Sequence, residues 1–289
     1  MQAIVHHKMD CELGEGPVWD DRKDELLWVD VHQHHLHFLA TNGSRETHSF
    51  NQMISFALPC LDDSYIIGLQ EGIFRYHRNT KDLAEIHNPE VHLPSNRFND
   101  GKCDPFGNVW AGTMSLDLQA NQGSLYKMDQ NLHITKQFGP VSISNGLAWN
   151  QELKRMYYVD SPSRTIYSWE YDESTESLDA PLNTFQTPKE MGFPDGMTID
   201  QEGMLWIAHW DGGCVGRWHP ELGQLITKVD IPAPRVTSCT FGAKEMTTLY
   251  VTTARVELSQ EQLSQFPLSG SVFAIDTNTK GSSVSLFKG

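Results

Sequence analysis

The chain has 289 residues, of which 39% are hydrophobic and 10% aromatic, a composition typical of a folded globular protein. Its 22 Lys and Arg residues stand against 37 Asp and Glu residues, which gives a formal net charge of −15. An acidic surface repels nucleic-acid phosphates and anionic lipid, so we expect neither nucleic acid nor a membrane as a partner.

The cysteine pattern and the chain start bear on the compartment. The five cysteines are scattered and form no CxxC pair, which argues against a disulfide framework or a zinc knuckle. The opening MQAIVHHKMD lacks the apolar core of a signal peptide, and no apolar run approaches the roughly 20 residues that span a bilayer. We therefore expect a cytoplasmic protein with free thiols, either a monomer or a weak homodimer.

Six similar units follow one another along the chain, each with two β-rich runs joined by a turn rich in Asp, Gly, Lys and Asn. This pattern predicts six β-hairpins. A third β-rich run usually follows, as in GSLYKMD or GSVFAIDT. The paired runs are 15–20 with 26–31, 55–60 with 65–70, 99–104 with 109–114, 145–150 with 156–161, 195–200 with 204–209, and 238–243 with 248–253.

The spacing of these units is about 45 residues, which is typical of propeller blades of four strands. We predict that residues 1–289 form a single all-β domain, a six-bladed β-propeller. A generic β-sandwich would not require six units in register. A WD40 propeller is disfavoured because the Trp-Asp pairs at 19–20 and 210–211 fall at different positions of the unit and lack a partner Gly-His.

Polar residues recur just before the glycine that opens several units. If the first strand of each hairpin lies nearest the axis, propeller symmetry brings these residues to one end of the central channel. Glu15, Asn145 and Asp195 occupy this position, as does Asp100 beside Asn99. Carboxylate and amide oxygens are ligands of hard divalent cations, and the following glycine allows a close approach to the axis. Turn chemistry alone is the alternative for any single copy.

Several motifs along essentially the whole chain resemble the senescence-marker-protein / gluconolactonase / luciferin-regenerating-enzyme family, which includes regucalcin. They are GEGPVWD, RFNDGKCDPFGNVWAGTM, SNGLAWN, FPDGMTIDQEGMLWIA and SCTFG with LYVTTAR. The resemblance implies a six-bladed propeller with one catalytic divalent metal ion, which is calcium, zinc, magnesium or manganese across the family. It also implies hydrolysis of sugar lactones such as gluconolactone.

The resemblance further implies roles for individual residues. Glu15, Asn145 and Asp195 match the metal-ligand motifs, and Arg97 and Asn99 match substrate-binding positions. The family has a substrate-contacting Glu shortly after GTM, where this chain has Asp117, whose shorter side chain changes the contact.

These features lead to a hypothesis of metal-dependent lactone hydrolysis. The metal acts as a Lewis acid on the lactone carbonyl, and Asp195 is either the general base or a ligand only. Two alternatives remain: a promiscuous esterase or organophosphate hydrolase, and a calcium-binding regulatory protein.

Histidines are set aside as ligands. At the first hairpin their alternation favours a solvated face for the group His32, His34, His35 and His37. His209 and Trp210 lie farther along the chain. The sequence favours neither a place in the channel wall nor a packing role at a strand end for them.

Overall fold

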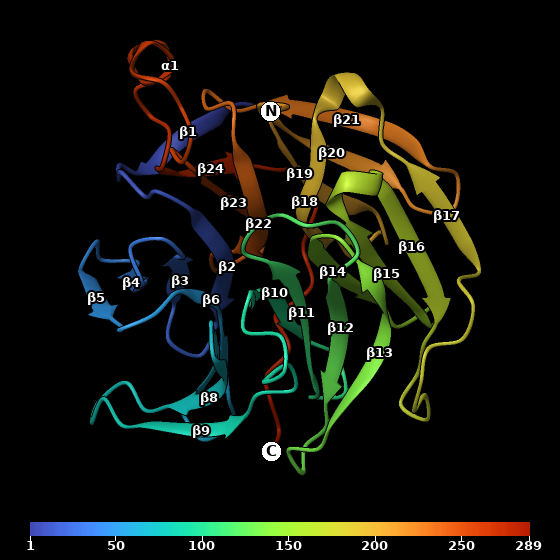
Figure 1. Ribbon diagram of the computed structural model, residues 1–289. Coiled ribbons are helices and arrows are strands. Elements are labelled where there is room, and N and C mark those ends of the chain that lie inside the picture. The colour runs from blue at the N-terminus through green and yellow to red at the C-terminus, as the bar shows by residue number, and fades with distance from the viewer.

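Six antiparallel sheets of four strands each stand around a central axis in the computed structural model (Figure 1). The structure describes residues 1–289, apart from the side chains of residues 183 and 184. Each sheet takes its strands in chain order from the axis outward, except the last. The prediction of a six-bladed β-propeller is confirmed.

The first three blades contain the strands β2 (Gly14–Asp20), β3 (Glu25–Asp30), β4 (His35–Ala40) and β5 (Arg45–Ser49); β6 (Ile54–Pro59), β7 (Tyr65–Leu69), β8 (Gly72–Tyr76) and β9 (Leu83–His87); and β10 (Asn96–Cys103), β11 (Val109–Ser115), β12 (Gly123–Met128) and β13 (Ile134–Val141). The next two contain β14 (Ser144–Asn150), β15 (Arg155–Asp160), β16 (Thr165–Glu170) and β17 (Asn183–Gln186); and β18 (Phe193–Ile199), β19 (Leu205–Trp210), β20 (Cys214–His219) and β21 (Gln224–Asp230).

The sixth blade joins the two ends of the chain. Its three inner strands are β22 (Val236–Gly242), β23 (Thr248–Thr253) and β24 (Val272–Asp276). Its outer strand is β1 (Ala3–His7), which pairs antiparallel with β24 (Figure 1). The sixth sheet thus closes the ring with residues from both ends of the chain, a feature that the repeat did not predict.

The first strand of every hairpin lies nearest the axis, as predicted. Figure 1 shows β2, β6, β10, β14, β18 and β22 around the centre, where each packs against the next. These strands all run in the same direction along the channel. Residues at their starts therefore meet at one end of it, and residues at their ends meet at the other.

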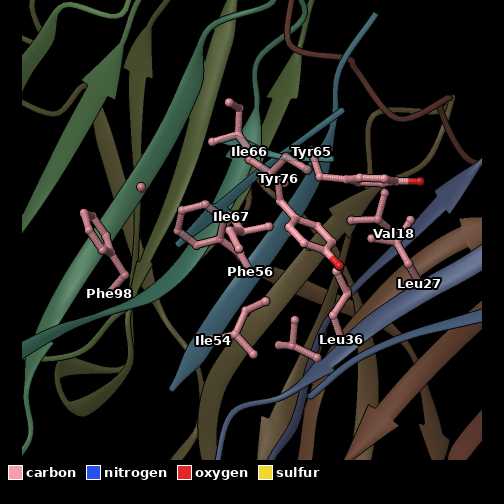
Figure 2. Close-up of a cluster of buried hydrophobic side chains, with 14 of the residues drawn as sticks. Val18, Leu27, Leu36, Ile54, Phe56, Tyr65, Ile66, Ile67, Tyr76 and Phe98 are labelled. Carbon is pink, nitrogen blue, oxygen red and sulfur yellow. The ribbon is translucent and has the colours of Figure 1, made fainter. Parts of the chain in front are cut away.

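Apolar side chains fill the spaces between blades. Figure 2 shows one such cluster, in which Phe56 of β6 meets the edge of Phe98 from the third blade and Leu27 approaches from the first. These side chains are at most 2% exposed. Burying each one contributes roughly 1.5–3 kcal/mol, so the contacts between blades stabilise the ring.

A buried aspartate organises the hairpin turn of two blades at the far end of the inner strands. Asp200 accepts hydrogen bonds from the backbone N–H groups of Glu202 and Met204, and its Oδ2 accepts one from Trp206 Nε1 at 2.9 Å. Asp104 holds Trp110 in the same way at 3.0 Å. The segments DPFGNVW and DQEGMLW are therefore one turn motif used twice.

The C-terminal segment crosses the far end of the channel (red in Figure 1). Gly281 of this segment forms a β-bridge with Asp200 of the fifth blade, and Phe287 forms one with Cys60 of the second blade. The short helices are η1 (Ser161–Ser163), η2 (Lys189–Met191) and α1 (Gln260–Gln265). Among the described residues, no helix is long and apolar enough to cross a membrane.

Candidate metal centre

A β-bulge interrupts each inner strand near its start. In the first blade the register shifts between Glu15 and Val18, and in the fourth between Asn145 and Leu147. Inner strands of the other four blades shift at the same place. A bulge turns a side chain out of its normal alternation, and it explains why a polar residue followed by Gly recurs at this point.

Two of the glycines allow the inner strands to pack closely around the axis. A Cβ on Gly146 would lie 2.7 Å from the carbonyl oxygen of Asp195, and one on Gly196 would lie 2.1 Å from Ser238 Oγ. No larger residue fits either position without moving the neighbouring strand. The glycine of this dipeptide is therefore required by close approach, as the sequence suggested.

In two blades, a buried aspartate at the end of the second strand fixes the loop that leads into the site. Asp30 accepts the backbone N–H groups of Glu12 and Leu13 at 2.9 and 3.1 Å, just before Glu15. Asp160 accepts the N–H groups of residues 142 and 143, just before Asn145. These bonds hold the start of each inner strand in place.

The structure brings Glu15 and Asp195 together at one end of the channel. They are 9% and 5% exposed. Burial and the nearby Asp100 carboxylate raise the pKa of Glu15 to about 8. Burial, followed by the Glu15 and Asp100 charges, raises the pKa of Asp195 well above its usual value. Without a cation, these carboxyl groups oppose each other's ionisation.

Asn145 lies beside this pair with its oxygen free. Its Nδ2 donates to Ser161 Oγ at 2.9 Å, and its amide also lowers the pKa of Asp195. Asn145 Oδ1 and Asp195 Oδ1 are both buried without a hydrogen-bond partner. Two carboxylates and an unpartnered amide oxygen form a donor set that fits a hard divalent cation. Among the described residues, no three His, Cys, Asp or Glu side chains are grouped so that they could hold a metal ion.

Arg97, from β10, lies close enough to the carboxylates of Glu15 and Asp195 to interact with their charges, and Asn99 of the same strand is hydrogen-bonded to Arg97. Arg97 is 6% exposed, and burial lowers its pKa to about 10 although the charges of Glu15 and Asp195 oppose that shift. The guanidinium therefore faces the same end of the channel as the acidic pair.

Asp100 adds a third carboxylate that the sequence placed in the ring but assigned no role. It accepts the N–H of Gly101 at 2.8 Å, and burial raises its pKa. Lys102, deeper in the channel, provides an opposing charge. Its Nζ donates to the carbonyl oxygens of Leu147 and Met197 at 3.1 and 2.7 Å, so it ties three inner strands together.

Asp117 is not brought into this group. It lies exposed in the turn after β11, where its backbone N–H donates to Ser115 Oγ at 3.2 Å. No contact of its carboxylate with Arg97 or Asn99 occurs among the described side chains.

The histidines divide between surface and interior. His32, His34 and His35 are not buried. His37 is 3% exposed, its ring lies tilted against that of Trp28 with the centroids 5.0 Å apart, and it contacts Thr47 Oγ1 at 2.9 Å. The expectation of a solvated face is wrong for His37 because its ring lies between Trp28 of β3 and Thr47 of β5, on either side of it in the same sheet. His209 is fully buried at the position that Asp30 and Asp160 occupy in their blades.

Comparison with known proteins places this geometry in context. Residues 13–255 match the model of the SMP-30/Gluconolactonase/LRE-like region. The "Putative sugar lactone lactonase YvrE" of Bacillus subtilis (strain 168) is 34% identical over 282 residues, 97% of each chain.

Two solved structures superpose on almost the whole chain. A luciferin-regenerating enzyme is 32% identical with a TM-score of 0.91, covering 99% of both chains. A calcium-binding protein, regucalcin, from Agrobacterium tumefaciens str. C58 is 26% identical with a TM-score of 0.91, covering 98% of both. The chain therefore belongs to the SMP-30/gluconolactonase/LRE-like family.

Proposed function

We propose that this protein is a metal-dependent lactonase that opens aldonolactones of five or six carbons, with Glu15, Asn145 and Asp195 as metal ligands. The observation that supports this most directly is the buried pair of carboxyl groups with raised pKa values beside an unpartnered amide oxygen. A divalent cation, whether calcium, zinc, magnesium or manganese, would offset that repulsion. The family membership supports the substrate class.

The bound cation would supply Lewis-acid polarisation of the lactone carbonyl. Asp195 would then accept a proton from the attacking water. Burial and the nearby carboxylates raise its pKa in the metal-free protein, so the bound cation would be needed to keep Asp195 ionised for this role. Glu15, which accepts the N–H of Gly16 at 3.1 Å, has a backbone donor that holds it in place as a ligand.

Arg97 would bind the substrate by donating to ring or hydroxyl oxygens. Its charge lies beside the carboxylate pair, where an oxygen-rich substrate must enter. Asn99 would support the same contact. Asp117, which lies exposed after β11, would reach a sugar hydroxyl only if the turn closed over the channel mouth.

The chain's cysteines support a cytoplasmic location for this reaction. Cys11, Cys60, Cys103, Cys214 and Cys239 are all free and buried. Unpaired thiols persist in a reducing compartment.

A calcium-binding regulatory role is the second candidate, favoured by the structural match to a calcium-binding regucalcin. It shares the metal centre but requires no turnover. An esterase or organophosphate hydrolase would also use the same centre. The three functions differ in what the protein hydrolyses.

A pH-indicator assay separates them, because opening a lactone releases acid. We expect the protein to hydrolyse five- or six-carbon aldonolactones, to lose activity in chelator and to regain it with added divalent metal. Asp195→Ala should lose turnover while its circular dichroism stays unchanged. Asp211→Ala, an exposed aspartate in the turn after β19, is the matched control and should keep activity.

Full lactonase activity of Asp195→Ala after exhaustive chelation would refute the mechanism. Tight calcium binding without turnover of any lactone would favour the regulatory role instead. Turnover of aryl esters or phosphotriesters alone would favour the other hydrolase.

A further inference from the structure

Asn145 is held differently from the carboxylates around it. Glu15 and Asp100 each accept the N–H of the glycine that follows them, at 3.1 and 2.8 Å. The N–H of Gly196 lies close enough to Asp195 to lower the pKa of its carboxyl group. Asn145 instead extends to another segment, where its Nδ2 donates to Ser161 Oγ at 2.9 Å. Its orientation therefore depends on a residue outside the inner strand.

Ser161 is a fixed point beside the channel. It is 7% exposed and begins η1, directly after Asp160 at the end of β15. Its own N–H donates to the carbonyl oxygen of Ile143 at 3.2 Å, and Asp160 holds the N–H of that same residue. The loop that leads into β14 and the turn that carries Ser161 are thus tied to each other next to Asn145.

The contacts of the Asn145 side chain fix which end of the amide faces which way. Nδ2 donates to Ser161 Oγ, and Oδ1 is buried without a hydrogen-bond partner. A serine oxygen can accept such a bond from an amide nitrogen. With Nδ2 bound at Ser161, Oδ1 is the end of the amide that is left free for a cation.

We propose that Ser161 is a positioning residue, whose hydroxyl holds the Asn145 side chain so that Oδ1 faces the proposed cation. This inference rests on the proposed metal centre. Residues that orient metal ligands typically change metal affinity by 10- to 100-fold when they are lost.

The test measures metal affinity rather than turnover. Mn²⁺ is titrated calorimetrically into the metal-free protein at constant pH. We expect Ser161→Ala to bind Mn²⁺ about tenfold more weakly, and Ser161→Thr, which keeps a hydroxyl, to stay within about threefold of the parent. Ser163→Ala is the control from the same turn: its Oγ donates to the Asp160 carbonyl at 2.8 Å and does not contact Asn145. It should bind like the parent.

A double-mutant cycle distinguishes positioning from a general structural effect. In an Asn145→Ala background the Ser161 hydroxyl has no amide to hold, so Ser161→Ala should change the affinity less than about twofold. Equal loss in both backgrounds, or parent-like binding by Ser161→Ala, would overturn the inference while leaving the metal centre in place. If Asn145→Ala itself binds Mn²⁺ like the parent, the proposed centre and this inference both fail.

Discussion

Arg97 and Asn99 hold each other on β10: Arg97 Nη1 donates to Asn99 Oδ1 at 2.9 Å, while Asn99 Nδ2 donates to the Ser144 carbonyl oxygen at 2.9 Å. The same Nη1 also donates to the carbonyl oxygen of Phe98 at 2.8 Å. Asn99 therefore links the guanidinium to the fourth blade. The RFNDG motif contains one clamp made of two residues rather than two independent contacts.

The clamp predicts how Asn99→Ala changes the proposed lactonase. Asn99→Ala removes the acceptor of the Arg97 guanidinium and, with it, the connection to the Ser144 carbonyl oxygen, so the guanidinium becomes more mobile. Substrate binding must then order the guanidinium again, which weakens binding. We expect KM to rise about tenfold with a smaller change in kcat. Steady-state kinetics on the best aldonolactone measure this split. Asn150→Ala, at the other end of β14, is the control and should leave KM unchanged; a fall in kcat alone for Asn99→Ala would contradict the clamp.

Metal removal should make stability depend on pH in a specific direction. Glu15 has a raised pKa in the folded protein, about 8, so between the unfolded value and about 8 the folded state binds more protons than the unfolded state. The metal-free protein therefore loses stability as the pH rises through this window. A bound cation favours the ionised carboxylates and should remove the loss.

Urea unfolding between pH 5 and pH 8.5, with chelator and with Mn²⁺, measures this effect. Glu15→Gln provides the reference, because an amide cannot titrate, and its metal-free stability should fall less across the window. Parallel stability profiles for the parent and Glu15→Gln in chelator would show that Glu15 does not carry the raised pKa.

The aspartate turns predict a stability effect that is separate from the metal centre. Asp200 accepts from two backbone N–H groups, from Trp206 and from Arg217 Nε at 2.8 Å, and it is 2% exposed. Asp200→Ala leaves these donors without an acceptor and should lower the free energy of unfolding by about 3 kcal/mol. Glu202→Ala, an exposed residue in the same turn, should cost less than about 1 kcal/mol. Equal losses in urea unfolding would contradict this account.

The C-terminal segment also predicts a loss of stability without a loss of metal affinity. Phe287 is fully buried against the second blade, and its backbone pairs there with Pro59 and Leu61. Phe287→Ala should destabilise the protein by about 3–5 kcal/mol through the cavity that it leaves. Mn²⁺ affinity below the unfolding temperature should stay at the parent value, because the metal centre lies at the opposite end of the inner strands. A tenfold loss of affinity would show that the two ends are coupled.

The repeat along the chain was sufficient to predict the blades and to place Glu15, Asn145 and Asp195 at one end of the channel. It succeeded because each hairpin is local, and because a polar residue before Gly marks the bulge in four of the six inner strands, those that contain Glu15, Asp100, Asn145 and Asp195. The family motifs added Arg97 and Asn99 to this end.

Other features depend on contacts that no local pattern encodes. The pairing of β1 with β24 joins opposite ends of the chain. Ser161 reaches Asn145 only because η1 folds back over the start of β14. His37 is buried by its cross-strand neighbours Trp28 and Thr47 in the same sheet, which alternation along its own strand does not reveal. Asp117 resembles a family position in sequence, yet its turn leaves it exposed.

The pairing of both chain ends in one blade has a consequence for synthesis. During synthesis, the first blade, which contains Glu15, emerges from the ribosome long before β22, β23 and β24 have been made. Yet Gly14, the residue before Glu15, accepts a hydrogen bond from Thr237 of that last blade. β1 must likewise wait without a hydrogen-bonded neighbour until β24, its partner in the sixth sheet, has been made. A chain that stops before β22 would carry Glu15, Asn145 and Asp195 but would lack the sixth blade, so we expect the proposed metal centre to be incomplete in it.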